Sequence, residues 1–120
     1  SRADLVLSKI NGDKVIVEVK AVTLELGGGV GAFPDAVSER ALKHVLELTK
    51  SINNSTRSLL IFCVFHSGIR KVTIARDIDP VYYSSLQSAL STGLEIQAWG
   101  VDISLNDLNL KKRLPFTLKL

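Results

Sequence analysis

The feature that most constrains this chain is a central run of seven apolar residues, Leu59-Leu60-Ile61-Phe62-Cys63-Val64-Phe65. Residues 57–65 lack the polar alternation of a strand with one wet face, and near-continuous runs of this kind are typical of strands buried on both faces. The run is far shorter than the roughly 20 apolar residues that a membrane span needs. It therefore predicts an interior strand in a covered sheet.

The composition is that of a globular protein. Apolar residues make up 46% and charged residues 22% of the 120 residues, which excludes a disordered chain and suffices for one core. The single cysteine, Cys63, excludes a disulfide framework and a multi-cysteine zinc site, and its place in the apolar run indicates an inert core residue. No signal-peptide pattern is visible. We therefore expect a reducing, cytoplasmic setting without a membrane partner.

The first half of the chain predicts a β-hairpin, a loop and a helix. Residues 2–7 and 14–22 are rich in Val, Ile and Leu, and a turn signal lies between them. Residues 25–34 contain four glycines and predict a flexible loop; the Lys-Ser or Lys-Thr pair of a phosphate-binding P-loop is missing. A helix is expected over residues 35–52, with Asp35 as its N-cap and Val37 in its buried stripe.

The second half predicts alternating strands and a helix. The buried strand at residues 57–65 is followed by a short strand at 71–74. A second helix begins with Asp79 as N-cap and Pro80 at its first position, and it ends before Gly93. Residues 94–103 form another strand, and residues 108–120 add an edge strand. The order predicts a single α/β domain over residues 1–120, with a mixed central sheet flanked by helices.

An acid and a lysine interrupt the second apolar strand. In residues 15–21 the side chains alternate between faces, so Glu18 and Lys20 share one face. We expect the valines at 15, 17 and 19, together with Ala21, to form the core face, and the charged pair to lie on the wet face. Buried charges are costly unless they are paired or bound to metal. A solvated strand face with a local ion pair is the alternative.

Asp4, in the preceding strand, meets Glu18 only in one class of hairpin register. A two-residue turn at Asn11-Gly12 would place Asp4 opposite Val19, on the core face, where an acid is untenable. A three-residue turn, over residues 10–12 or 11–13, would place Asp4 on the face of Glu18 and Lys20. The chemistry therefore predicts the odd-length turn.

These residues together suit a hard divalent cation. Carboxylate oxygens of Asp4 and Glu18, with the backbone carbonyl of Val19, are the ligands that Mg²⁺ or Mn²⁺ prefers. Lys20 beside the ion would orient or deprotonate an attacking water and neutralise charge on a phosphate. An Asp, then a strand bearing Glu-x-Lys, then a helix is the arrangement of the PD-(D/E)xK, or restriction-endonuclease-like, core. We assign catalytic roles to Asp4, Glu18 and Lys20.

The sequence resembles the C-terminal domain of the sugar fermentation stimulation protein (SfsA) family. The resemblance spans nearly the whole chain in the expected order. The matching segments are Ser1-Arg2-x-Asp4, Val17-Glu18-Val19-Lys20-x-Val22-Thr23-Leu24, Phe33-Pro34-Asp35-Ala36-Val37-x-Glu39-Arg40-x-x-Lys43-His44, His66-Ser67, Ala75-Arg76-x-Ile78-Asp79-x-x-Tyr82 and Lys111-Lys112-x-Leu114-Pro115. The departures, Ser38 for a Thr and Ala41 for a Gly, lie outside the metal set.

The resemblance implies a function for the domain. Family members resemble two-domain bacterial proteins with an N-terminal OB-like domain, absent here, and a C-terminal nuclease-like domain. The family also implies DNA binding without strong sequence preference and a regulatory role in sugar (maltose-type) utilisation. A further acidic residue, which this nuclease class often takes from a preceding helix, would lie upstream of Ser1.

The basic residues and the first helix add candidate contacts. A net charge of +3 permits a polyanionic partner without requiring one. We expect Glu39, Lys43 and His44 to border the site; an exposed i,i+4 ion-pair row with a core-edge histidine is the alternative. We interpret His66 as a structural or surface residue, and Asp79 rather than Asp77 as the helix cap. The candidates for DNA phosphate contacts are Arg2, Arg40, Lys111, Lys112 and Arg113.

Three functions remain open. The first is a DNA-binding protein on a nuclease-type scaffold that cleaves weakly or not at all. The second is an active Mg²⁺-dependent endonuclease or exonuclease. The third is a non-catalytic interaction domain whose charges serve solubility. No small-molecule cofactor is expected, and the sequence does not indicate an oligomeric state.

Overall fold

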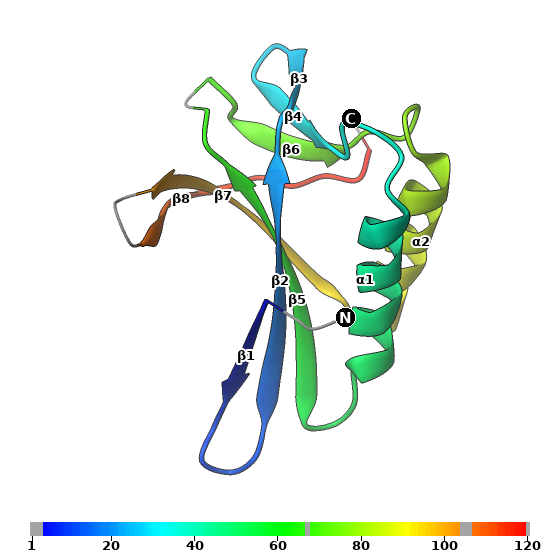
Figure 1. Ribbon diagram of the computed structural model, residues 1–120, viewed down its shortest axis with the longest axis vertical. Coiled ribbons are helices and arrows are strands. Elements are labelled where there is room, and N and C mark those ends of the chain that lie inside the picture. Colours follow the sequence, from blue (N-terminus) through cyan, green and yellow to red (C-terminus); the bar gives the residue numbers. More distant parts are fainter. Residues whose placement is uncertain (1–3, 67, 104–106, 120) are drawn as a thin grey trace.

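Two sheets and two helices make up the computed structural model, which describes residues 4–66, 68–103 and 107–119 (Figure 1). The elements in chain order are β1 (Leu5–Ser8), β2 (Lys14–Val22), β3 (Leu24–Gly27), β4 (Val30–Phe33), α1 (Glu39–Ser51), β5 (Thr56–Val64), β6 (Lys71–Ile74), α2 (Pro80–Thr92), β7 (Glu95–Ile103) and β8 (Leu108–Leu114).

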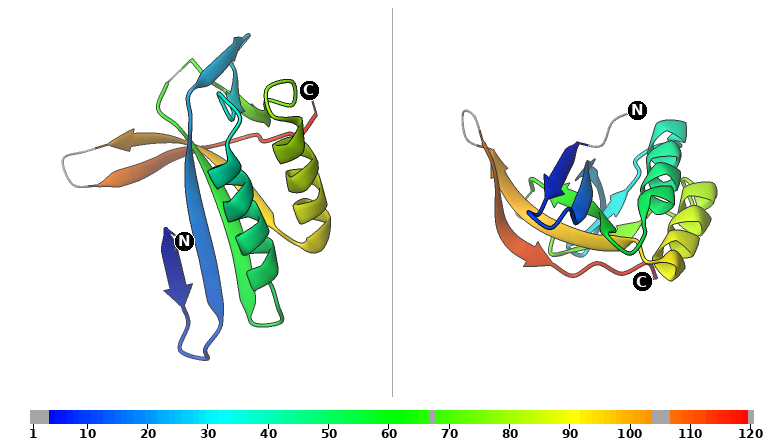
Figure 2. Two further views of the ribbon diagram at one scale, coloured as in Figure 1. Left: turned by 45° about the vertical axis from the view of Figure 1, so that its right-hand side comes forward. Right: turned by 90° about the horizontal axis from the view of Figure 1, so that it is seen from below.

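The main sheet has five strands in the order β1-β2-β5-β7-β8. The three central strands, β2, β5 and β7, are parallel, whereas β1 and β8 are antiparallel to their neighbours at the two edges. Because parallel neighbours need a crossover, α1 lies between β2 and β5 in the chain, and α2 between β5 and β7. Both helices cover the same face of the sheet (Figure 2). The predicted mixed α/β sheet is confirmed.

A second, three-stranded sheet stands where the glycine-rich loop was expected. Residues 25–34 mostly belong to the antiparallel pair β3 and β4, and β4 continues in parallel with β6. Gly27, Gly28 and Gly29 all have positive φ, so the glycines serve the turn between the two strands. The expectation of a loop was wrong because tight turns and flexible loops are both rich in glycine, so composition does not distinguish them.

Helix α1 begins later than its sequence signals suggested. Ser38 is the N-cap, and its Oγ accepts a hydrogen bond of 3.0 Å from the backbone N–H of Ala41. Asp35 lies outside the helix, where its Oδ2 accepts from Thr23 Oγ1 at 2.9 Å. Val37, expected in the buried stripe, is 69% exposed. Asp35 and Ser38 are both of residue types that cap helices well. Because Asp35 bonds to Thr23, Ser38 is the residue that caps the helix.

Helix α2 follows its predicted boundaries. Asp79 is the N-cap and accepts from the backbone N–H of Tyr82 through Oδ1 at 3.0 Å, and Pro80 occupies the first turn. Gly93 ends the helix at φ +112°, a conformation that only glycine adopts without strain. The other oxygen of Asp79, Oδ2, accepts from the backbone N–H of Ser38 at 3.1 Å. One buried carboxylate therefore joins the N-termini of both helices.

The core fills the space between the main sheet and the helices. Leu60, Phe62 and Val64 of β5 point toward the helices and are almost fully buried. Ser58 faces the same way, since its Oγ donates to the carbonyl of Leu48 on α1. On the other face of β5, Leu59 and Ile61 are half-buried. The strand is therefore interior, as predicted, but only its helix-facing side is completely covered.

Cys63 is buried, as its place in the apolar run predicted. Burial raises the pKa of the Cys63 thiol, which disfavours the reactive thiolate. Among the described residues, neither helix is long and apolar enough to cross a bilayer.

Candidate functional site

The hairpin register brings Asp4 next to Glu18. Ser8 pairs with Lys14 and Leu5 with Val17, which leaves a three-residue turn over residues 10–12, closed by a bond from the Lys9 N–H to the Asp13 carbonyl. Gly12 ends the turn at φ +91°. Of the two odd-length turns, the structure thus selects the one at residues 10–12. Continued by one residue, this register sets Asp4 opposite Glu18.

Glu18 and Lys20 share the helix-covered face of the sheet, not a wet face. Ile16 packs against the core and Val22 belongs to it, and both alternate in phase with the charged pair. Glu18 is only 4% exposed. Val17 on the other face is buried, but Val15 and Val19 are only half-buried and Ala21 is exposed. The predicted assignment of core and wet faces was wrong, because two-residue alternation does not say which face a helix will cover.

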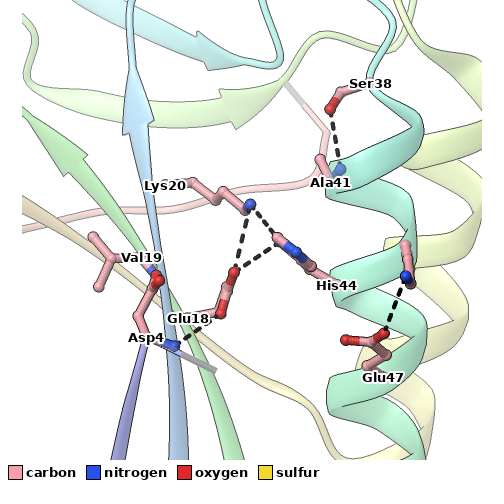
Figure 3. Close-up of polar contacts among 9 residues, drawn as sticks. Asp4, Glu18, Val19, Lys20, Ser38, Ala41, His44 and Glu47 are labelled. Carbon is pink, nitrogen blue, oxygen red and sulfur yellow. Dashed lines mark hydrogen bonds and ion pairs between the residues drawn. The ribbon is translucent and has the colours of Figure 1, made fainter. Parts of the chain in front are cut away.

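The outer part of the site is a corner at the end of β1. The backbone N–H of Val19 donates to Asp4 Oδ2 at 2.7 Å, and the Asp4 N–H donates to Glu18 Oε2 at 3.2 Å (Figure 3). Lys9 bonds to the Asp13 carbonyl, and hydrogen-bonded pairs alternate along an antiparallel ladder, so the backbone N–H and carbonyl groups of odd-numbered residues of β2 face β1. Those of Val19 therefore point to the side of Asp4, as the bond from its N–H to Asp4 also shows. The corner therefore gathers oxygens of Asp4, Glu18 and Val19.

The inner part of the site joins β2 to helix α1. His44 Nδ1 lies 2.7 Å from Glu18 Oε1 and 2.7 Å from Lys20 Nζ, while Lys20 Nζ lies 3.6 Å from Glu18 Oε1 (Figure 3). His44 is 4% exposed. Glu18 thus has one oxygen directed to the Asp4 corner and the other held by His44 and Lys20.

His44 was expected only at the margin of the site, and the structure places it in direct contact. Ala41, His44, Val45 and Leu48 form the buried stripe of α1. Their spacing of three or four residues was a usable sequence signal that His44 points inward. An inward histidine opposite a strand with two charged residues on the helix-facing side is the combination that identifies the contact.

Glu39 and Lys43 are exposed on α1. Lys43 Nζ lies 4.0 Å from Glu47 Oε1, one turn further along the helix. Among residues 4–66, 68–103 and 107–119, neither Glu39 nor Lys43 forms a hydrogen bond or ion pair with Glu18 or Lys20. The structure thus places these two on the outer surface of the helix that carries His44.

The basic residues fall into separate regions. Arg2 lies outside the described residues. Arg40 is exposed in the first turn of α1, four residues before His44. Lys111, Lys112 and Arg113 are exposed on β8, three strands away from β2, or about 14 Å at the usual strand spacing of about 4.8 Å. The run on β8 therefore lies at the edge of the sheet opposite to β1 (Figure 1).

Two members of the β8 run have local partners. Lys111 Nζ lies 3.4 Å from Asp102 Oδ2 on β7, and the Arg113 guanidinium lies 5.9 Å from the centre of the Trp99 ring. His66, interpreted as a structural or surface residue, is exposed, and its Nδ1 accepts from the Gly68 N–H. In the described part of the chain, no three His, Cys, Asp or Glu side chains surround one point as metal ligands. Any cation at the corner therefore depends on a backbone oxygen and water as well.

Comparison with known proteins settles the family. A family model described as the sugar fermentation stimulation protein RE domain, SfsA, matches residues 1–107. The chain belongs to the SfsA family. A sugar fermentation stimulation protein homolog of Saccharophagus degradans is 46% identical over 114 residues, 95% of this chain and 48% of that SfsA protein. The homolog of Aliivibrio salmonicida is 40% identical over 118 residues, 98% of this chain and 50% of the relative.

A solved structure of an SfsA protein shares the fold. The structure of Pyrococcus furiosus SfsA in complex with Ca²⁺ aligns with a TM-score of 0.84 at 27% identity, over 98% of this chain and 51% of that one. The chain therefore spans about half the length of the SfsA relatives that it matches.

Proposed function

We propose that this chain is a DNA-binding domain with a nuclease-type metal site, built on a PD-(D/E)xK core. The observation that supports this is that Glu18 of β2 contacts both Lys20 and Asp4, the residue directly before β1, while the Val19 N–H donates to Asp4. An Asp followed by Glu-x-Lys on a strand is the residue arrangement of the PD-(D/E)xK core. The family membership supports a cytoplasmic bacterial protein with a role in sugar utilisation.

The donor set of the corner fits a hard divalent cation. Asp4, Glu18 through Oε2 and the Val19 carbonyl would hold Mg²⁺ or Mn²⁺, because these ions prefer oxygen ligands and keep several waters. When bound, the cation would supply charge neutralisation on a phosphate and a more acidic water. The Ca²⁺ in the Pyrococcus furiosus relative supports an oxygen-lined site, since Ca²⁺ is another hard cation.

The protein's own residues perform the remaining tasks. Lys20, whose side chain is 14% exposed, stands at the boundary between the buried cluster and the surface, where its ammonium can contact a phosphate oxygen or a water. Glu18 is held from three sides by the Asp4 N–H, His44 and Lys20, so its position costs no reorganisation when a ligand arrives.

DNA binding would rest on phosphate contacts without reading bases. Arg40 and the β8 residues Lys111, Lys112 and Arg113 are exposed cations suited to phosphates, and such contacts carry no sequence information. Binding by the full-length protein should fall steeply as salt rises, because counterions are released from DNA. Filter binding at two salt concentrations tests this. Absent or salt-independent binding would refute the DNA-binding proposal.

An active Mg²⁺-dependent endonuclease or exonuclease is the second candidate. The observation that favours it is the amine of Lys20 beside the carboxylate of Glu18, which is the pair that activates water in nucleases. Linear, nicked and single-stranded DNA, each incubated with full-length protein and Mg²⁺ or Mn²⁺, decide between the two. Cleavage by wild type that is lost in Glu18→Gln and Lys20→Met establishes the enzyme; cleavage that survives both variants assigns it to a contaminant.

Cation binding itself is measured separately from DNA binding. Calorimetric titration of full-length protein with Mn²⁺ should show a site that Asp4→Asn and Glu18→Gln each weaken. Asp35→Asn is the matched control, since Asp35 is an exposed carboxylate bonded to Thr23 outside the corner. If Mn²⁺ binds equally well to all four proteins, the interaction-domain alternative replaces the metal site.

A further inference from the structure

One ring nitrogen of His44 lies within hydrogen-bond distance of two groups, but it can form a hydrogen bond with only one of them at a time. Nδ1 lies 2.7 Å from Glu18 Oε1 and 2.7 Å from Lys20 Nζ, and those two atoms are 3.6 Å apart. A ring nitrogen carries either one hydrogen or one lone pair, in a single in-plane direction. Nδ1 therefore either donates to Glu18 or accepts from Lys20.

We propose that His44 is the positioning residue of the site, donating from Nδ1 to Glu18 and thereby setting the places of both Glu18 and Lys20. This adds a positioning residue to the proposed metal site. The consequences for cation binding rest on that proposed function, whereas the hydrogen bond between His44 and Glu18 does not depend on it.

The burial of Glu18 selects the donor state. Glu18 is 4% exposed, and a buried carboxylate without adequate donors is costly. Oε2 has the Asp4 N–H at 3.2 Å, whereas Oε1 would have only Lys20 at 3.6 Å, beyond good hydrogen-bond length, if Nδ1 did not donate. Lys20 is less buried and can turn its ammonium to water. The unsatisfied carboxylate is the larger cost, so Nδ1 carries the hydrogen.

The first consequence concerns which oxygen of Glu18 faces the corner. With Oε1 fixed by His44, the carboxylate cannot rotate about its last bond, and Oε2 is left on the side of Asp4 and the Val19 carbonyl. Partners behind a ligating carboxylate orient it and are worth roughly 10- to 100-fold in metal affinity. His44 would thus act on a bound cation through Glu18, without contacting it.

The second consequence concerns Lys20. An N–H on Nδ1 repels the ammonium that lies 2.7 Å away, so His44 does not bind Lys20 directly in this state. Glu18, whose Oε1 lies 3.6 Å from Nζ, is then the partner of Lys20 in this cluster. His44 thus sets the place of Lys20 through the carboxylate that it holds.

A metal-independent measurement tests the hydrogen bond directly. Long-range ¹H–¹⁵N correlation spectra of the full-length protein, without added metal, distinguish a ring nitrogen that bears hydrogen from one that has a lone pair. We expect Nδ1 of His44 to bear hydrogen in wild type and in Lys20→Met. A lone pair on Nδ1 in wild type would overturn the proposal, because Lys20 would then be the partner.

Two conservative replacements test the positional role. The amide nitrogen of asparagine lies near the place of Nδ1, whereas that of glutamine lies near Nε2. In Mn²⁺ titrations we expect His44→Gln and His44→Leu to lose about 10- to 100-fold in affinity and His44→Asn to lose clearly less. Equal affinity of His44→Gln and wild type, or equal losses in all three variants, would overturn the proposal.

A packing control separates positioning from general damage to the helix. Val45 is 1% exposed and neighbours His44 in the buried stripe, so Val45→Ala should lower the melting temperature and leave Mn²⁺ affinity unchanged. A loss of affinity in Val45→Ala equal to that of His44→Gln would refute a specific role for Nδ1. Failure of wild type to bind Mn²⁺ would refute the metal site, while the metal-free spectra would still decide the hydrogen bond.

Discussion

Glu18 is the residue around which the candidate site is organised, and its carboxylate is almost entirely removed from water. Its two oxygens are divided between a strand edge and a helix, and each side supplies donors. Buried polar groups are normally satisfied in this way. The core also contains two phenol hydroxyls, of Tyr82 and Tyr83, that find no hydrogen-bond partner within the described residues.

Tyr82→Phe should leave the protein as stable as wild type, or more stable, at pH 7. The hydroxyl is buried without a partner in the described part of the chain, and an unsatisfied group of this kind costs about 1–3 kcal/mol. Urea unfolding at pH 7 measures the change, and Tyr83→Phe, which removes the other unpartnered hydroxyl, should move in the same direction. A loss of more than about 1 kcal/mol would show a hidden bond.

The same variant should change the alkaline limit of stability. Burial, with the charge of Asp79, raises the pKa of Tyr82 well above its ordinary value of about 10. The folded state thus keeps the phenol proton longer than the unfolded state, so its contribution is complete below about pH 10 and is lost as pH rises further. Tyr82→Phe should lose less stability than wild type between pH 9 and 11 in parallel unfolding curves. Identical alkaline losses would contradict the prediction.

Sequence reasoning singled out charged residues that the structure brings together, but it misjudged their surroundings. Asp4, Glu18 and Lys20 stand out because acids and amines are rare in apolar strands, and burial makes them conspicuous. Whether their face is wet depends on where α1 packs, which is a tertiary property. The contact of His44 needed the same information, although its inward direction was visible in the helical spacing.

At the element scale, the length of one turn determines the site. The three-residue turn at 10–12 holds the register in which Asp4 stands opposite Glu18. A shift of one residue in the pairing register sends every side chain of a strand to the other face. The corner is thus a product of hairpin geometry as much as of residue identity.

Deletion of Ser8 from β1 should abolish Mn²⁺ binding while the fold survives. With the turn at residues 10–12 kept, the shortened strand would place Asp4 opposite Val17, on the other face of the sheet from Glu18. Titration with Mn²⁺ and circular dichroism measure the two effects. Gly12→Ala is the control: it strains a φ of +91° and should cost about 1 kcal/mol, but it keeps the register and the affinity. A deletion variant that binds Mn²⁺ normally would show that Asp4 is not a ligand.

Asp79→Ala should destabilise the protein more than the loss of an ordinary helix cap. Asp79 accepts from Tyr82 on α2 and from Ser38 at the start of α1, so its removal leaves donors at two helices. One cap is worth about 1 kcal/mol, and the loss here should reach about 2–3 kcal/mol in urea unfolding. Ser38→Ala, which removes the side-chain cap of α1 alone, should cost about 1 kcal/mol. Equal losses in both variants would contradict the bridging role.

Elements whose ends are marked by capping residues could be predicted from the sequence. Elements that depend on contacts with distant segments could not. The Asp-Pro start and the Gly end of α2 lie in the sequence itself, and the structure confirms both. The pair β3 and β4 was missed because a run rich in glycine gives little strand propensity, and its strands are stabilised by the distant β6. The predicted start of α1 was also wrong because of a contact with a distant residue: Asp35 bonds to Thr23 and does not cap the helix.

For the whole molecule, the basic run and the acidic corner lie at opposite edges of one sheet. The strand order β1-β2-β5-β7-β8 separates them. A nucleic acid that contacts both must cross the width of the sheet. Mutations should therefore be able to change the affinity for DNA without changing the affinity for a cation, and the reverse.

Replacement of Lys111, Lys112 and Arg113 by alanine should weaken DNA binding by the full-length protein and leave Mn²⁺ affinity intact. Each lost phosphate contact should reduce the slope of log K against log salt by about 0.9 for duplex DNA. Filter binding over a salt series measures the slope, and Lys50→Ala, an exposed cation in the last turn of α1, is the matched control. An unchanged slope in the triple variant would remove β8 from the interface.

The edge strand β1 has a further consequence. Leu5, Val6 and Leu7 are each about half exposed, at 49%, 51% and 52%, and Ile10 in the adjoining turn is fully exposed. A strand with apolar side chains on both faces and a free backbone edge is a template onto which a second chain can add. In concentrated solutions of the domain, self-association should therefore begin at β1, the strand that directly follows Asp4. Polar or proline replacements there would increase solubility, but they would perturb the segment that positions Asp4.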